Sequence, residues 1–382
     1  HQRHGNLVAG TFFNKKFLFV ADPEAIEEIF SLEAKGFLNR DMLYQAKKTL
    51  FGDGIINSKT ELWVKQRRIM QPIFSKDMVK EWEAIILEEA NLLKTQFKGA
   101  LKVNLTSDFR FLVQSIFIKI LLGISLEFRE RKALRISIEH ISQGLVPLML
   151  SEVFIGKAKW LYPFINKRFF LALAQLKKFI GEVLPQVINQ PGHNLASILF
   201  QATDKNSDFR LTEALLQDEA VGFLFAGQDT TANTLIWFFY LIGWHPEIHQ
   251  KISEEIAQFK NEPLHSGVLS QYRYTRAALN ETLRVYPPTE ALATQVIDDI
   301  MISGQRIAKG TLVFLSLYAV HHHPLVWSQP ETFNPERFYS DPEERPKYAF
   351  FPWGGGLHNC LGRHLAELEM MIIIITLLRE YR

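Results

Sequence analysis

The N-terminal half of the chain carries two kinds of hydrophobic pattern. Residues 7–21 (LVAGTFFNKKFLFVA) alternate between apolar and polar positions around a turn-like Asn14-Lys15-Lys16, and this pattern predicts a β-hairpin. The following DPEAIEEIF predicts a helix with Asp22 as its cap and Pro23 at the first helical position. From residue 58 to about residue 199, apolar residues recur three and four apart, which predicts a succession of helices.

A long helix is predicted from Thr212 to about Trp244. Its middle (VGFLFAG, then TLIWFFYLIGW) is apolar nearly all round, so this helix must run through a core. The remaining predicted elements are helices over 246–260 and 270–286, two strands within 298–318 around Gly304 and Gly310, and a last helix that begins at about Cys360.

These elements indicate a mainly α fold with a minor β-sheet. Polar breaks at 189–194 and 203–208 are too short to be clear linkers between domains. We therefore expect a single domain over residues 1–382, with the long helix at its centre.

Composition and charge narrow the class of protein. The 382 residues are 47% hydrophobic, and 43 basic against 41 acidic residues give a net charge of +2, which does not support nucleic-acid binding. One cysteine excludes an internal disulfide and a zinc site of several thiolates, and it fits a reducing, cytoplasmic location. The apolar run 370–378 is too short to span a bilayer, while a membrane anchor upstream is left open.

The single cysteine lies in the glycine-rich stretch FPWGGGLHNCLG, residues 351–362. Glycines let a backbone lie against a flat object, and we expect loop amides and the start of the last helix to face the Cys360 sulfur and stabilise a thiolate. A lone cysteine is most often an inert buried side chain. No oxyanion hole accompanies His358, as a nucleophilic thiolate would need. A haem iron bound by the thiolate explains the glycines, the helix start and the single cysteine together.

Polar residues interrupt the long apolar helix at AGQDTTANT. Gly227 weakens the helix there, and the interruption is either a bend packed against a neighbour or a functional site. Phe223, Ala226 and Thr230 fall on one stripe, so a small residue one turn before a hydroxyl leaves a gap for a diatomic ligand over a flat cofactor. Asp229 beside this alcohol makes a plausible pair for proton delivery.

At this point the motifs resemble those of the cytochrome P-450 superfamily, the haem-thiolate monooxygenases, over nearly the whole chain. FPWGGGLHNCLG looks like the haem-binding loop, which implies haem b with Cys360 as the axial ligand of its iron. AGQDTT matches the oxygen-activation motif, which implies proton delivery by Asp229 and Thr230. The other matches are ETLR with Glu281 and Arg284, NPERF with Arg337, and WVKQRR with Trp63 and Arg67.

The resemblance also implies roles for the remaining residues. Glu281, Arg284 and Arg337 would form a structural ion network, and Trp63 and Arg67 would hold a haem propionate. Further cofactor contacts are expected at Ala226, Gly227, Trp353, Gly354, His358 and Gly362, and an apolar substrate pocket at Phe223, Ala226, Ala291 and Leu292. The triple histidine of YAVHHHPLVW is expected to be structural.

Three positions depart from the family pattern. Trp353 stands where the family usually has phenylalanine, His358 replaces the more frequent arginine, and Thr294 stands where another propionate-binding arginine is common. Haem anchoring is therefore expected to depend more on Trp63 and Arg67. We also expect a short N-terminal segment and a C-terminal β-hairpin of the family to lie outside this sequence.

The implied reaction inserts one atom of O2 into an apolar small molecule, with electrons from a separate redox protein of the ferredoxin, flavodoxin or reductase type. A peroxygenase or isomerase on the same scaffold is an alternative, although neither needs the Asp229–Thr230 pair. A haem-binding sensor or carrier without turnover is another, and it would not consume reduced pyridine nucleotide in a substrate-dependent way. The basic, aromatic stretch 154–180 indicates either contact with a membrane surface or a solvated pair of helices.

Overall fold

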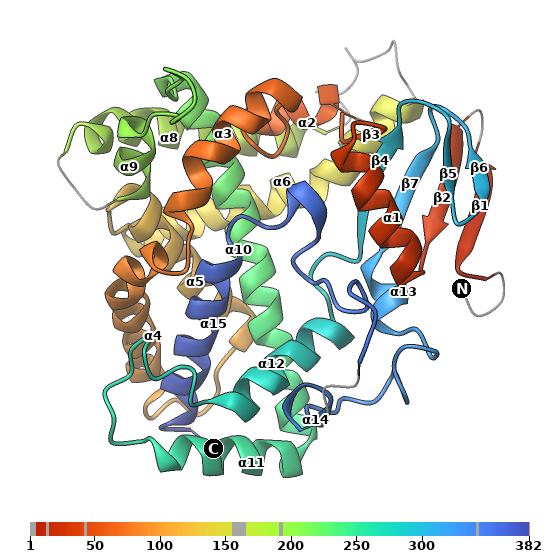
Figure 1. Cartoon of the computed structure of the whole chain (residues 1–382). Coiled ribbons are helices and arrows are strands. Elements are labelled where there is room, and N and C mark those ends of the chain that lie inside the picture. Colours follow the sequence, from red (N-terminus) through yellow and green to blue (C-terminus); the bar gives the residue numbers. More distant parts are fainter. Residues whose placement is uncertain are drawn as a thin grey trace. The chain divides into compact units, whose positions relative to one another are not determined.

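The computed structural model describes residues 5–12, 15–41, 44–154, 166–190, 194–340 and 344–381 (Figure 1). The chain forms two compact units, which we call the sheet unit (His1–Met42, Asn233–Arg363 and Met370–Arg382) and the helical unit (Leu43–Ala232 and His364–Glu369). The long helix α10 (Glu213–Trp244) and the last helix α15 (Arg363–Leu378) contribute residues to both units. The single-domain organisation stays a prediction.

The sheet unit contains a five-stranded sheet of order β1-β2-β7-β4-β3, in which β2 and β7 pair in parallel and the other neighbours are antiparallel. Its strands are β1 (Leu7–Phe12), β2 (Lys15–Val20), β3 (Leu38–Asn39), β4 (Ala291–Val296) and β7 (Leu312–Ser316), and a separate hairpin joins β5 (Ile300–Ile302) to β6 (Gln305–Ile307). Its helices are α1 (Pro23–Ala34), α11 (Pro246–Gln258), α12 (Arg273–Val285), α13 (Leu317–His321) and α14 (Glu336–Tyr339).

The predicted hairpin and the first helix are confirmed, with one correction. β1 pairs with β2 from Leu7 opposite Val20 onward, but Lys15 and Lys16 belong to the second strand rather than to the turn, and Asn14 lies outside the described residues. The pairing extends to Lys15 opposite Phe12. Successive side chains of a strand point to opposite faces, so Lys15 and Lys16 can both belong to β2 while their backbones pair with β1.

Helix α1 covers this sheet, as Figure 1 shows, and it begins where the sequence predicts. The Asp22 side chain accepts a 2.8 Å hydrogen bond from the backbone N–H of Ala25, and Pro23 is the first helical residue. Ile26 and Ile29 on its buried face pack into one apolar cluster with inward-facing residues of the sheet. Full burial of such a side chain stabilises the fold by about 1.5–3 kcal/mol.

Residues 298–318 correct the prediction of two strands, because they hold three. Gly304, with φ of 75°, makes the tight turn between β5 and β6, and Gly310, with φ of 83°, lies just before β7. Both positions need the left-handed region that glycine adopts without strain. The sequence therefore marks both turns correctly and underestimates only the number of strands that they separate.

A buried ion pair lies on helix α12 of the sheet unit. The Arg284 guanidinium donates two parallel hydrogen bonds of 2.8 Å to the Glu281 carboxylate, and both side chains are 0% exposed. Arg337 adds a 3.3 Å contact to the same carboxylate, and the backbone N–H of Asn334 donates to it at 2.9 Å. This carboxylate therefore fixes α12 to the segment around α14.

All the regular elements described for the helical unit are helices. They are α2 (Tyr44–Phe51), α3 (Thr60–Ile73), α4 (Glu83–Phe97), α5 (Leu105–Leu122), α6 (Phe128–Phe154), α8 (Lys167–Ile188) and α9 (Leu195–Gln201), together with the first part of α10 and the short turn η1 (Met78–Trp82). The mainly α fold with a minor sheet is thus confirmed.

Two carboxylates on α10 hold helix α3 within the helical unit. Glu219 accepts hydrogen bonds from the Gln66 side chain at 2.7 Å and from the backbone N–H of Ile55 at 2.9 Å. Asp218 accepts from the backbone N–H of Asp53 at 2.9 Å. Burial raises the pKa of Glu219 to about 8. The Gln66 bond fixes the middle of α3, and the other two bonds fix the segment just before it. Helix α3 carries two of the predicted cofactor residues, Trp63 and Arg67.

None of the described helices combines the length and the apolar character needed to cross a bilayer. Within the stretch 154–180, residues 155–165 lie outside the described residues, and helix α8 takes up the remainder. The two interpretations of this stretch stay predictions.

We expect Arg284→Ala to lower the free energy of unfolding by about 3–5 kcal/mol, because it leaves the Glu281 carboxylate buried without its partner. Urea unfolding followed by circular dichroism measures the change. Lys309→Ala is the control, since its pair with Asp298 lies at the surface and should matter little. Equal stability of Arg284→Ala and Lys309→Ala would contradict a structural role for the buried pair.

Candidate functional site

The loop around the single cysteine folds back on itself within the sheet unit. The backbone N–H of Cys360 donates to the carbonyl of Trp353 at 2.8 Å, and that of Gly354 donates to the carbonyl of Phe351 at 2.9 Å. Gly354 and Gly356 have φ values of 70° and 62°, which side chains rarely tolerate. The glycines therefore make a tight turn that returns the chain to Cys360.

The structure corrects one expectation about the sulfur's surroundings. Helix α15 begins at Arg363 rather than at Cys360, because Leu361 and Gly362 form a turn between the cysteine and the helix. The amides of Gly354 and Cys360 bond to carbonyls of the loop and close the turn, and the prediction that other loop amides face the sulfur stays a prediction. The helix dipole therefore acts on the thiol from a greater distance than the sequence predicts.

Close packing on one side of this loop explains its middle glycine. A Cβ atom on Gly355 would lie 2.5 Å from the Phe30 ring and 2.6 Å from the Tyr348 ring. Phe30 belongs to α1, so the loop lies directly against that helix. Leu292 of β4 reaches the loop from the sheet, with its methyl group 3.4 Å from a Cβ on Gly354.

The other side of the loop fits a large planar cofactor. Cys360 is exposed, Leu357 is an exposed apolar side chain, and a Cβ on Gly362 would meet no atom within 4 Å. A cysteine thiolate is a soft donor that can bind haem iron. The residues present on this face are therefore compatible with haem bound through Cys360.

The polar interruption in α10 has a specific hydrogen bond and a specific contact. The Thr230 hydroxyl donates to the carbonyl of Ala226 at 2.8 Å, one turn earlier. A Cβ on Gly227 would lie 2.8 Å from the Phe117 ring of α5, so this glycine lets two helices approach. Phe223 is buried against Phe74, with ring centroids 5.7 Å apart. Gly227 and Phe223 thus have packing roles inside the helical unit.

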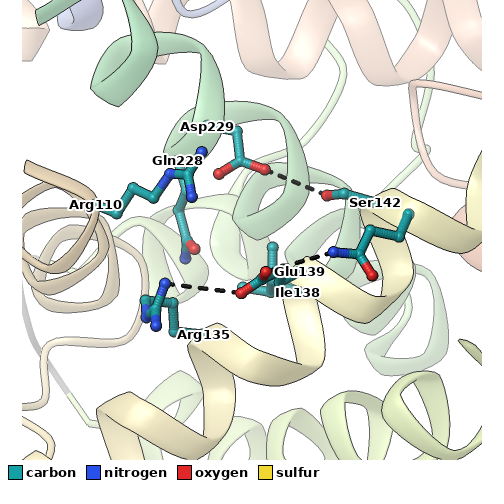
Figure 2. A pocket seen from close by; sticks show the side chains of 8 residues that line it. Arg110, Arg135, Ile138, Glu139, Ser142, Gln228 and Asp229 are labelled. Atoms are coloured by element: carbon teal, nitrogen blue, oxygen red, sulfur yellow. Dashed lines mark hydrogen bonds and ion pairs between the residues drawn. The ribbon is translucent and has the colours of Figure 1, made fainter. Parts of the chain in front are cut away.

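Asp229 lies at a charged cavity of about 210 Å³ between helices α5, α6 and α10. Figure 2 shows Asp229 and Ser142 reaching toward each other, and the Ser142 hydroxyl donates to the carboxylate at 3.2 Å. Arg110 lies on another side of this cavity, where the buried side-chain nitrogen of Gln228 has no hydrogen-bond partner among the described residues. Such a cavity is polar enough to hold water next to Asp229.

The structure places the remaining predicted cofactor and pocket residues on several different elements. Trp63 and Arg67 lie one turn apart on α3, and both are half-buried. Thr294 is buried and its hydroxyl donates to the carbonyl of Asn39 at 2.9 Å, so it stabilises the β3–β4 pair. His358 is half-buried in the short turn η3 (Gly356–His358), and Ala291 is exposed at the start of β4.

The triple histidine is buried in the sheet unit. His321, His322 and His323 are each less than 5% exposed. No group of three potential metal ligands occurs within the described part of the chain. His321 instead contacts the cysteine loop, and this contact is not visible in the sequence motif.

Ser142 is the site residue that the sequence gives no means of finding. It lies on α6 and its partner Asp229 lies on α10, 87 positions later in the chain. Neither periodicity nor a motif marks one serine among the many in the helical segment. Only the packing of α6 against α10 identifies it.

The sequence of this chain matches a family model and known proteins over nearly its whole length. The family model named Cytochrome P450 matches residues 1–382. A relative from Streptomyces melanosporofaciens, named cyclooctat-9-en-7-ol 5-monooxygenase, is 25% identical over 384 residues, which cover 99% of this chain and 83% of that protein. A human ultra-long-chain fatty acid omega-hydroxylase is 25% identical over 398 residues, covering 95% of this chain and 73% of the human protein.

Solved structures agree with the fold. The cyanobacterial CYP120A1 bound to retinoic acid superposes with a TM-score of 0.86 at 25% identity, covering 99% of this chain and 85% of that one. The haem domain of cytochrome P450DA gives a TM-score of 0.86 at 22% identity, covering 98% of this chain and 83% of that one. The match across the full sequence shows that this chain belongs to the cytochrome P450 family of haem-containing monooxygenases.

Proposed function

We propose that this P450 enzyme inserts one atom of O2 into a lipophilic small molecule, with electrons from a separate redox protein. The observation that carries this proposal is the exposed Cys360 in a tight glycine turn, in a chain whose family uses haem. When bound, haem b supplies the activation of dioxygen. The protein supplies the sulfur ligand, the anchoring of the cofactor, protons and an apolar binding surface.

Cys360 ligates the iron as a thiolate in this proposal, and Trp63 and Arg67 hold a propionate. A guanidinium binds a carboxylate with two parallel hydrogen bonds, so Arg67 suits that role. The bond from Gln66 to Glu219 supports this role, because Gln66 adjoins Arg67 and fixes the orientation of α3 within the helical unit. Position 294, where the family often has another propionate-binding arginine, holds Thr294, whose hydroxyl donates to the carbonyl of Asn39. This position therefore supplies no positive charge to a propionate.

Asp229 and Thr230 deliver protons in the proposed reaction. The charged cavity beside Asp229 gives that carboxylate access to water, and Ser142 holds one of its oxygens. The Thr230 hydroxyl donates to the carbonyl of Ala226. A hydroxyl can rotate away from such a bond and donate to another acceptor instead. An acid with access to water and an adjacent alcohol together provide the parts of a proton relay.

The substrate is proposed to be lipophilic. Ala291 and Ala226 are small, exposed apolar residues, and Leu292 is half-buried beside the cysteine loop. The relatives are named for cyclooctat-9-en-7-ol and an ultra-long-chain fatty acid, and a solved neighbour carries retinoic acid. These molecules have long or cyclic apolar bodies, and that shared chemistry supports the lipophilic class without identifying one compound.

The proposed reaction is tested by turnover with isotope-labelled dioxygen. The haem-loaded protein is mixed with a surrogate ferredoxin and its reductase, reduced pyridine nucleotide and a panel of terpenes, fatty acids and retinoids. We expect substrate-dependent consumption of the nucleotide and a product that carries one labelled oxygen atom. Product formed only with added peroxide would indicate a peroxygenase, and binding without any product would indicate a carrier.

Removal of the Thr230 hydroxyl should separate electron consumption from product formation. Thr230→Ala removes only the hydroxyl and a methyl group, so haem and substrate binding should persist while proton delivery fails. We expect reduced nucleotide to be consumed still, with most electrons ending as hydrogen peroxide. If the product formed per electron stays at the wild-type value, Thr230 does not deliver protons.

Ser142→Ala tests whether the contact at the cavity orients Asp229. We expect more peroxide per electron than in the wild type and less than in Thr230→Ala, because the carboxylate remains but loses one fixed donor. Ser137→Ala is the matched control on the same helix, since its hydroxyl bonds to Ala133 and Gln175. Peroxide yields that are equal in the Ser142 and Ser137 variants would count against this role for Ser142.

Trp353→Phe tests whether the indole tunes the iron. Trp353 and Cys360 are joined by a backbone hydrogen bond, and an indole N–H donated to the thiolate would withdraw charge from sulfur and favour ferrous iron. A hydrogen bond to a charged group contributes about 1.5–3 kcal/mol, which sets a ceiling of about 60–130 mV for one electron. We expect a potential more negative by tens of millivolts. A redox titration that finds no difference would leave Trp353 with a packing role.

A further inference from the structure

His321 is fully buried at the end of helix α13, beside the loop that carries Cys360. Its ring nitrogen Nε2 accepts a hydrogen bond of 3.1 Å from the backbone N–H of Phe351, the first residue of that loop. The imidazole also contacts the rings of Phe350 and Phe351, at centroid distances of 5.3 and 5.6 Å. The ring is thus held by aromatic packing with its acceptor facing the loop backbone.

The backbone of the same residue bonds to the buried ion pair. The carbonyl of His321 accepts a 2.8 Å hydrogen bond from Nη1 of Arg284, which also donates to the carbonyl of Pro330 at 2.7 Å. Arg284 cannot shift freely because its other nitrogens hold the Glu281 carboxylate. His321 is therefore bonded on its backbone side to α12 and on its ring side to the cysteine loop.

Further bonds relate Phe351 to Cys360. The carbonyl of Phe351 accepts from the Gly354 amide, and the carbonyl of Trp353 accepts from the Cys360 amide. The hydrogen bond from Phe351 to His321 is therefore the first of three successive bonds along the loop, and the last of them is made by the amide of Cys360. A shift at Phe351 would change the turn whose left-handed glycines return the chain to Cys360.

We propose that His321 is a positioning residue, which sets the place of the Cys360 loop relative to the Glu281–Arg284 pair. This inference rests on the proposed role of Cys360 as the iron ligand. The geometry alone requires an acceptor at Nε2, since the buried Phe351 amide would otherwise lack a partner. A ring that served only to fill space would not need that nitrogen.

The chemistry of the imidazole agrees with an acceptor role. Burial, together with the positive charge of Arg284, lowers the pKa of His321 to about 3. The ring is therefore neutral at physiological pH, and its Nε2 lone pair stays available to the Phe351 amide. A histidine that must accept at all working pH values is well served by such surroundings.

The test compares variants that keep or remove the acceptor in the full haem-loaded chain. His321→Gln places an amide oxygen near the position of Nε2, His321→Asn is polar but too short to reach Phe351, and His321→Leu removes the acceptor. Each protein is reduced in the presence of carbon monoxide, and the lifetime of its strongly red-shifted Soret band, the signature of thiolate ligation, is measured. Circular dichroism confirms that each variant is folded.

We expect the lifetime of the red-shifted band to fall about tenfold in His321→Leu and His321→Asn, a factor that corresponds to about 1.4 kcal/mol. His321→Gln should retain most of the wild-type lifetime. The control is His323→Leu, a buried neighbour whose ring bonds to Asn6 and accepts from the backbone N–H of Leu325, and it should match the wild type. Should His321→Leu fail to fold, the comparison of Gln with Asn still reports on the hydrogen bond.

Two results would overturn the inference. One is a wild-type lifetime in the Asn variant, and the other is an equal loss in the Gln and Asn variants, which would assign His321 to packing alone. Failure of the proposed ligand is distinguishable from both, because the wild-type protein itself would then lack the red-shifted band. That outcome would overturn the Cys360 assignment and this inference with it.

Discussion

The buried carboxylate of Glu281 is the constraint on which the sheet unit depends. A carboxylate that is 0% exposed must have its charge compensated and its oxygens bonded, and here Arg284, Arg337 and the Asn334 amide do so. Arg284 then uses its remaining donors on the carbonyls of the chain before α14. One charge thereby determines where several irregular segments run.

The cysteine loop shows why such an anchor is needed. A turn with two left-handed glycines has many alternative conformations in the unfolded chain, so its native form needs outside contacts. Phe30 and Tyr348 close on Gly355 from one side, and the His321 ring bonds to Phe351. The thiol remains exposed on the face that these contacts leave open. Rigidity on one face and exposure on the other are what a metal ligand on a loop requires.

Much of the fold and of the site could be predicted from interactions between residues that are close in sequence. The features that could not be predicted depend on contacts between residues far apart in the chain. The Asp22 cap, the apolar helix α10 and the glycines beside Cys360 act through neighbours in sequence, so the sequence shows them. The late start of α15 was missed because a turn of two residues leaves no mark in an apolar pattern. The strand β3, of two residues, exists only through its pairing with β4. Ser142 likewise depends on a partner far along the chain.

The most direct test of the account is the absorption spectrum of the reduced, carbon monoxide-bound protein, measured with Cys360→Ser beside it. The account predicts the strongly red-shifted Soret band of thiolate ligation in the wild-type chain and its loss in the serine variant, with the helical circular dichroism of both proteins unchanged. A globin-like band in intact, folded wild-type protein, or a red-shifted band that persists in Cys360→Ser, would contradict the assignment of Cys360 as the iron ligand.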